Sequence, residues 1–257
     1  MARLQDKVII ITGAAQGMGA THARLCVEAG AKVVLTDINA EKGQAVAAEL
    51  GSNALFIQHD VTSEEGWAQV VAQTEAKFGA VNVLVNNAGI TMAKSILDVS
   101  LEDYRRIIEI NQVSVFLGMK AVIPSMKNSQ AGSIINISSI NGLVGGAIGY
   151  TDSKFAVRGM TKAAALACAP DGIRVNSVHP GVIATPMIMQ GDTKAVVEQF
   201  AKSIPLKRLA QPEEVSSIVL YLASDESSYS TGSEFIVDGG LTAQYPCCWA
   251  AIHVAHV

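Results

Sequence analysis

The sequence predicts an α/β fold in which helices cover both faces of one doubly wound, parallel sheet of seven strands. Short apolar runs typical of strands buried on both faces begin near residues 8, 32, 54, 81, 133, 174 and 234, with helical stretches between them. The first strand runs directly into a glycine-rich turn. No linker, low-complexity run or fixed-period repeat divides the chain, so residues 1–244 are expected to form a single domain.

The composition supports an ordered domain and argues against binding to polyanions. The chain has 257 residues, of which 49% are hydrophobic and 16% charged. This length is sufficient to bury a large core. The net charge of −4 and a pI near 5.7, with no cluster of Lys and Arg, exclude a nucleic-acid-binding surface, which needs a basic face.

Cysteines and histidines show neither a disulfide framework nor metal-ligand spacing, so no metal site is expected. The pair Cys247-Cys248 is adjacent, whereas zinc ligands are normally two to four residues apart. Each of the five histidines is interpreted as a surface or satisfied core residue. The apolar run at Val8–Ile11 is too short for a signal peptide or a membrane span. We therefore expect a cytoplasmic protein without a membrane segment.

The first strand, turn, helix and second strand form a dinucleotide-binding unit of the Rossmann type. The strand Val8–Ile11 precedes the glycine turn at 12–19, and a helix is expected over 20–29. The second strand, 32–36, closes with Asp37. Glycines let the backbone approach a pyrophosphate, whose charge is stabilised at the helix N-terminus. The alternative, a plain tight turn, does not explain the complete unit.

The acid at the end of the second strand favours NAD over NADP. The Asp37 carboxylate can accept hydrogen bonds from both ribose hydroxyls and would repel a 2′-phosphate. Neither Gln16 nor Ile38, the positions where a base could neutralise that phosphate, is Lys or Arg.

Six motifs in order give a resemblance to the short-chain dehydrogenase/reductase family over about residues 5–244. The turn Thr12-Gly13-x-x-x-Gly17-x-Gly19 matches the family's T-G-x-x-x-G-x-G, and Asn86-Asn87-Ala88-Gly89 matches its N-N-A-G. The other matches are Asp60-Val61 after the third strand (54–58), Asn111 after a helix at 101–110, Asn136-Ile137-Ser138-Ser139 at the end of the fifth strand (133–137), and Pro180 to Thr185 after the sixth strand (174–178). The ending, 232–240, resembles the seventh strand and closing turn.

The resemblance implies a set of cofactor-binding residues. These are Gly13, Gln16, Gly17, Met18, Gly19, Asp37, Ile38, Asp60, Val61, Asn87, Ala88, Gly89, Tyr150, Lys154, Pro180, Gly181, Ile183 and Thr185.

Tyr150 and Lys154 form the chemical centre of the prediction. Four apart on a helix, their side chains share one face. A fixed ammonium favours the phenolate, so the pKa of Tyr150 is expected to fall toward the working pH and to make it a general acid or base. By resemblance, Lys154 also holds the nicotinamide ribose. A solvated helix lysine is the alternative interpretation.

The resemblance implies two further catalytic residues, Ser139 and Asn111. Ser139 matches the family's catalytic serine and steadies the substrate oxygen, whereas Ser138 is expected to be structural, with its hydroxyl bonded to backbone. The loop from Ser139 to Tyr150 is a residue or two shorter than is usual in the family. Asn111 corresponds to a residue that holds a water beside Lys154, although an asparagine that only satisfies a helix end has the same sequence. Asp152 receives no role beyond surface exposure.

The predicted activity is interconversion of a secondary alcohol and a ketone with NAD. Ser139, Asn141, Tyr150 and Met187 are expected to contact substrate, and residues 186–204 correspond to the family's substrate loop. The Met-rich, uncharged rim favours a hydrophobic substrate, as in the family's bacterial hydroxysteroid and cyclic-alcohol dehydrogenases. One alternative is a 3-oxoacyl carrier-protein reductase, and another is a catalytically silent dinucleotide-binding protein.

The apolar tail, 245–257, lies beyond the last family match. It is expected to pack on a neighbouring subunit, the alternative being a frayed end or added residues. By resemblance the protein is a homotetramer, with helices at 111–126 and 150–168 forming the main dimer contact.

Overall fold

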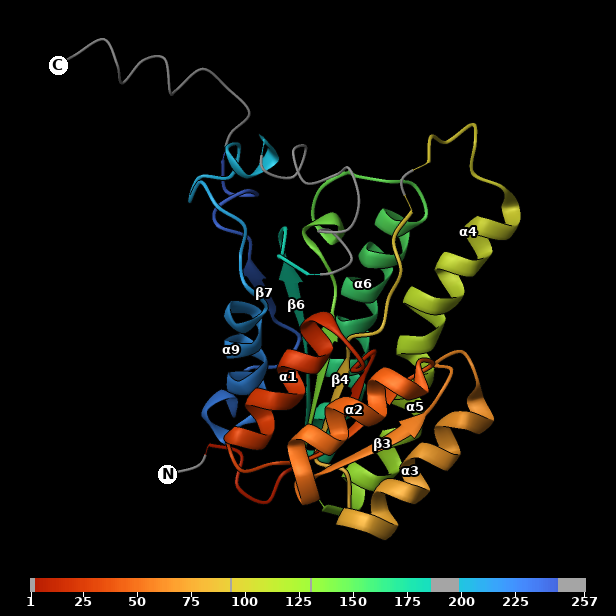
Figure 1. Cartoon of the computed structure of the whole chain (residues 1–257), viewed down its shortest axis with the longest axis vertical. Helices are drawn as coiled ribbons and strands as arrows, with labels where there is room; N and C mark the ends of the chain where they lie inside the picture. The colour runs from red at the N-terminus through yellow and green to blue at the C-terminus, as the bar shows by residue number, and fades with distance from the viewer. Residues whose placement is uncertain (1–2, 93, 130, 186–198, 245–257) are drawn as a thin grey trace, which may run out of the picture.

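The computed structural model describes residues 3–92, 94–129, 131–185 and 199–244, and in them one parallel sheet of seven strands (Figure 1). The strand order is β3-β2-β1-β4-β5-β6-β7. The strands are β1 Val8–Thr12, β2 Lys32–Asp37, β3 Ala54–Gln58, β4 Val83–Asn86, β5 Gly132–Ile137, β6 Ile173–Pro180 and β7 Glu234–Val237. The predicted fold class is therefore confirmed.

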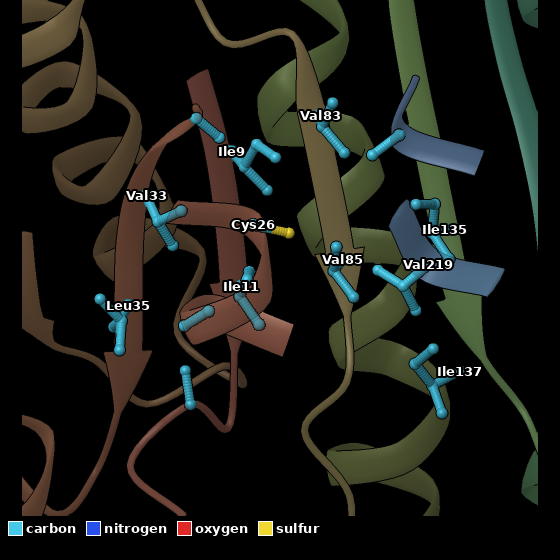
Figure 2. Packing of buried hydrophobic residues seen from close by; sticks show 14 of the residues in the cluster. Ile9, Ile11, Cys26, Val33, Leu35, Val83, Val85, Ile135, Ile137 and Val219 are labelled. Atoms are coloured by element: carbon cyan, nitrogen blue, oxygen red, sulfur yellow. The ribbon is translucent and has the colours of Figure 1, made fainter. Parts of the chain in front are cut away.

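Alternate residues of each strand enter two separate cores. Ile9 and Ile11 of β1 pack on the face covered by α1 (Gly17–Glu28), α2 (Ala40–Leu50) and α9 (Pro212–Ala223), part of which Figure 2 shows. Ile10 points to the other face, toward α3 (Glu64–Phe78), α5 (Ser114–Ser129) and α6 (Tyr150–Cys168). Both sides of the strands are buried, which explains why they are continuous apolar runs rather than alternating ones.

The strand order reverses between β1 and β4, and this position organises the carboxyl edge of the sheet. The chain leaves β1 toward β2 on one side, whereas β4 and the later strands lie on the other. Ligands of open α/β sheets bind at such a switch point. The glycine turn after β1 and the residues after β4 therefore lie next to each other at this edge.

The helix bounds differ from the expectation in two places. The first helix begins at Gly17, not at residue 20, so the last two glycines of the turn belong to α1. The predicted end of a helix before Asn111 is wrong: α4 (Leu101–Ile108) continues through a π turn, Glu109–Val113, into α5. Asn111 is thus inside a continuous helical stretch and fully buried.

That stretch, Leu101–Ser129, is long and apolar enough to cross a membrane by length and composition alone. In the folded chain its residues Val115, Met119, Val122 and Met126 are buried in the second core. These four residues therefore account for part of its apolar composition. Part of the substrate loop, including Met187, and the tail at 245–257 lie outside the described residues.

Candidate active site

Thr12 and Asn87 join the glycine turn to the segment after β4. The Thr12 hydroxyl accepts hydrogen bonds from the backbone N–H groups of Asn87 and Ala88, each at 3.0 Å. The Asn87 amide in return donates to the carbonyls of Thr12 (2.9 Å) and Gly13 (3.2 Å). Gly13 has a φ of +63°, and a Cβ there would lie 2.9 Å from the Ala88 Cα. The two predicted cofactor segments are held together by this contact.

The N-terminus of α1 has the features of an anion site. Its N-cap, Gln16, makes no side-chain capping bond, and no acid lies in the first turn, which holds Gly17, Met18 and Gly19. By contrast α2, α3 and α4 are capped by Asn39, Ser63 and Ser100, and each has an acid in its first turn. The α1 amides are left for an external anion, and the residues fit a pyrophosphate.

The Asp37 carboxylate spans the glycine turn and the loop after β2. It accepts hydrogen bonds from the backbone N–H groups of Ala15 (3.1 Å) and Asn39 (2.9 Å). Ile38 beside it is 69% exposed. Lys42 of α2 donates to the Gln16 amide oxygen at 2.9 Å, so an ammonium lies next to Gln16 although neither Gln16 nor Ile38 is itself basic.

Asp60 and Val61 follow β3 at the same edge of the sheet. The Asp60 carboxylate accepts hydrogen bonds from the backbone N–H (2.9 Å) and hydroxyl (2.8 Å) of Thr62. These bonds lower the pKa of Asp60. The Val61 carbonyl accepts from the buried indole of Trp67, which anchors the turn on α3.

Beyond β6, the segment from Pro180 to Thr185 forms the other side of the edge. A Cβ on Gly181 would lie 2.8 Å from the Asp238 Cα, which explains the glycine. Ile183 and Thr185 are buried, and Ile183 pairs with Ala210 in an isolated parallel bridge. The structure thus brings the predicted cofactor residues to one edge of the sheet.

Tyr150 begins α6, and Asp152 fixes that beginning. Gly149, the N-cap, has a φ of +77°, and its N–H donates to the Asp152 carboxylate at 2.6 Å. Asp152 therefore has a structural role, which the sequence interpretation missed. An acid at the third helical position is the signal that identifies such a cap.

Ser139 and Lys154 lie next to Tyr150. Burial raises the pKa of Tyr150, and a hydrogen bond with Ser139 acts in the opposite direction. The Lys154 ammonium is 5.6 Å from the centre of the phenol ring and donates to the Ile137 carbonyl at 2.9 Å. The expected lowering of the Tyr150 pKa is therefore wrong for this structure, because the effect of burial exceeds that of Ser139.

Lys154, Asn111 and Gly89 form a second contact group. Burial lowers the pKa of Lys154 to about 8. A Cβ on Gly89 would lie 3.3 Å from the Asn111 Oδ1 and 3.6 Å from the Lys154 Nζ, so the glycine permits this approach. The Asn111 amide donates to the Ser153 hydroxyl at 3.2 Å, which donates to the Tyr150 carbonyl at 2.7 Å. Ser153 thus links Asn111 to the first turn of α6.

Of the two serines after β5, Ser138 makes the backbone hydrogen bond that was expected for it. The Ser138 hydroxyl donates to the Lys154 carbonyl at 2.9 Å, a bond to backbone. The Ser139 hydroxyl accepts from the Asn141 N–H at 3.1 Å. The Asn141 side chain donates to the Gly145 carbonyl at 3.2 Å and thus packs on its own loop.

Comparison with known proteins identifies the family. Residues 13–242 match the family model described as "Enoyl-(Acyl carrier protein) reductase", which belongs to the short-chain dehydrogenases/reductases. A crystal structure of a short-chain type dehydrogenase/reductase from Mycobacterium marinum is similar, with a TM-score of 0.89 and 36% identity, covering 94% of this chain and 97% of that one.

Curated relatives extend over nearly the whole chain. The 3-alpha-(or 20-beta)-hydroxysteroid dehydrogenase of Mycobacterium tuberculosis is 52% identical, covering 94% of this chain and 91% of its own length. Cyclopentanol dehydrogenase of Comamonas testosteroni is 50% identical (95% and 100%). The NADP-dependent (R)-specific alcohol dehydrogenase of Lentilactobacillus kefiri is 44% identical (94% and 99%). The chain therefore belongs to the short-chain dehydrogenase/reductase family, whose oxidoreductases use a nicotinamide dinucleotide.

Proposed function

We propose that this protein interconverts a hydrophobic secondary alcohol and a ketone with NAD(H), using Tyr150 as the acid and base. The observation that carries the proposal is the grouping of Tyr150 and Lys154 on α6, with the ammonium 5.6 Å from the centre of the phenol ring and close to Gly89, and with Ser139 lowering the pKa of the phenol. A phenol, a hydroxyl and an ammonium supply a proton donor or acceptor, an oxygen ligand and a positive charge.

In alcohol oxidation Tyr150 would act as the phenolate, which takes the hydroxyl proton while Ser139 holds the oxygen by a hydrogen bond. Because burial raises the pKa of Tyr150, the positive charge of Lys154 has to stabilise that phenolate. The glycine turn and Asp37 would hold the dinucleotide, whose nicotinamide would supply the chemistry of accepting the hydride from the carbinol carbon and of returning it in the reverse direction. Lys154 can assist this proton transfer, because its pKa, although lowered to about 8, still leaves the ammonium mostly charged at neutral pH. Asn111 and Ser153 hold the first turn of α6 and the segment after Gly89 in register.

The preference for NAD rests on Asp37. Its carboxylate is fixed by two backbone N–H groups at the end of β2, where it would repel a 2′-phosphate. The NADP-dependent relative from Lentilactobacillus kefiri makes this a necessary measurement. We expect kcat/KM with NAD to exceed that with NADP by at least tenfold. Asp37→Ser should reduce this ratio, and an unchanged ratio would refute the role of the carboxylate.

The substrate class is inferred from the relatives and from the apolar rim of the loop at 143–148. Two relatives are named for hydroxysteroids and cyclopentanol. A carrier-protein thioester is the second candidate, because the matching family model carries that description. Assays with NAD and androsterone, cyclopentanol or cyclohexanol, and with NADH and acetoacetyl carrier protein, separate the two.

Tyr150→Phe is the decisive variant, because it removes the phenol oxygen and keeps the ring. We expect a loss of turnover of about 10²–10⁴-fold, with the Kd of NAD changed less than threefold. The matched control is Tyr221→Phe on α9, far from the site in sequence and on the other face of the sheet, which should keep full activity. Full turnover by Tyr150→Phe would overturn the proposal. Absence of activity in the wild-type chain with every substrate, despite NAD binding, would favour the catalytically silent alternative.

The proposed assembly is a cytoplasmic homotetramer. Phe116 of α5, Phe155 of α6 and Leu166 of α6 are 50%, 41% and 81% exposed, an apolar surface that association would cover. Light scattering of the wild type and of Leu166→Glu tests this contact. A monomeric wild type would contradict it.

A further inference from the structure

His179, at the end of β6, connects the sheet to the backbone of Ser139. The side chain is fully buried. Its Nδ1 lies 2.9 Å from the Ser139 carbonyl oxygen, and its Nε2 lies 2.9 Å from the Ser177 hydroxyl oxygen. His179 is thus a core histidine with both ring nitrogens hydrogen-bonded, as expected. The expectation did not include its contact with Ser139.

The two partners define the tautomer. A carbonyl oxygen can only accept, so Nδ1 carries the hydrogen that is donated to Ser139. Burial lowers the pKa of His179, so the ring is neutral and Nε2 accepts from the Ser177 hydroxyl. The charged groups around the ring are Lys154 and Arg158 of α6 and Glu234 of β7.

This bond controls the peptide from which the Ser139 side chain projects. The Ser139 carbonyl accepts one further hydrogen bond, from the Gly142 N–H at 2.9 Å. Gly142 belongs to the same loop as Ser139, whereas His179 belongs to the sheet. The Ser138 N–H already donates to the Val178 carbonyl of β6 at 2.8 Å. The imidazole adds a contact that ties the next carbonyl, that of Ser139, to the sheet, and with it the position of the Ser139 hydroxyl.

We propose that His179 is a positioning residue that holds the Ser139 hydroxyl in its reactive place through the Ser139 carbonyl. The proposal rests on the proposed function, since it presupposes that Ser139 steadies the substrate oxygen. The proposal requires that residue 179 carry an N–H donor at its δ position, where it can bond the Ser139 carbonyl.

A set of substitutions tests this requirement. His179→Asn keeps an N–H donor at the δ position and should stay within about threefold of the wild-type kcat. His179→Leu removes the donor and should lower kcat about tenfold, the effect of one lost hydrogen bond, with the KM for NAD changed less than twofold. His22→Leu is the matched control, because His22 is also fully buried and bonded by Nδ1 to a serine hydroxyl, that of Ser216, at 2.6 Å. It should lower thermal stability and leave kcat unchanged.

The double variant Ser139→Ala/His179→Leu separates positioning from general destabilisation. If His179 acts through the Ser139 hydroxyl, adding His179→Leu to Ser139→Ala changes kcat less than twofold. In the single His179→Leu variant the pH at half-maximal alcohol oxidation should also rise, since the bond from Ser139 lowers the pKa of Tyr150.

Equal kcat values for His179→Leu and the wild type, or full additivity in the double variant, would overturn the inference. A fully active Tyr150→Phe would instead overturn the proposed function, so the two failures are distinguishable.

Discussion

Asn111 pairs with Ile90 through both ends of its side-chain amide. The Oδ1 accepts from the Ile90 N–H at 2.8 Å, and the Nδ2 donates to the Ile90 carbonyl at 2.9 Å. The Asn111 amide thus makes the two backbone hydrogen bonds that a neighbouring strand would otherwise make with Ile90. The π turn of α4–α5 thereby fixes the backbone directly after Gly89.

Removing this pairing should destabilise the fold. Asn111→Leu leaves the Ile90 N–H and carbonyl without these partners, and we expect a loss of about 1–3 kcal/mol in the free energy of unfolding. Urea unfolding measures it. Asn128→Leu, an exposed position near the end of α5, is the control and should change stability by less than about 0.5 kcal/mol. Equal losses of stability in the two variants would contradict the role of the hydrogen bonds between Asn111 and Ile90.

Asp152 should stabilise the start of α6. Asp152→Ala removes the acceptor for the Gly149 N–H and is expected to cost about 0.5–2 kcal/mol, the usual effect of a lost N-cap interaction. Asp152→Asn keeps an acceptor oxygen and should be milder. Thermal unfolding of the three proteins gives the order, and a more stable Ala variant than Asn variant would disprove the capping role.

The buried Lys154 makes stability depend on alkaline pH. Its pKa in the folded state is about 8, below the unfolded value of 10.5, so the unfolded chain binds more protons between these pH values. Stability therefore rises with pH in that window. Relative to Lys154→Met, the wild type should gain roughly 2–3 kcal/mol between pH 7 and pH 10. Urea unfolding at pH 7, 8.5 and 10 tests the trend, and a constant difference would contradict it.

Glu234 should make stability depend on acid pH, and here too stability rises with pH, in the window between about 2 and 4.5. It bonds Arg158 (2.9 Å) and Lys162 (2.8 Å) of α6, and its pKa falls from 4.5 to about 2. Its stabilising effect is complete above about 4.5 and is lost as pH falls toward 2.

The cations around Glu234 are 35% and 52% exposed, so solvent screening reduces the effect. We expect Glu234→Gln to cost about 1 kcal/mol at pH 7 and clearly less at pH 3. An equal cost at both pH values would exclude the ion pairs as its cause.

The sequence predicted the strands well because parallel strands buried on both faces leave continuous apolar runs. It predicted the glycine turn because positive φ at Gly13 and the close contact at Gly19, where a Cβ would lie 2.2 Å from the Gly13 carbonyl oxygen, demand that residue type. The π turn at Asn111 was not predictable in this way, since one extra residue in a helical turn leaves no periodic signal. The contact of Lys42 with Gln16 was not predictable either, because it joins two elements through residues that are 26 positions apart in the chain.

The order of residues alone determined the fold class and the family, because these depend on local patterns and on residue chemistry, and it led to the proposal that Tyr150 carries proton transfer. The folded chain decided the electrostatics and the supports of the site: the raised pKa of Tyr150, the lowered pKa of Lys154 and the contact of His179 with Ser139. These properties arise from burial and from partners distant in the chain, and both exist only once the sheet and helices have packed.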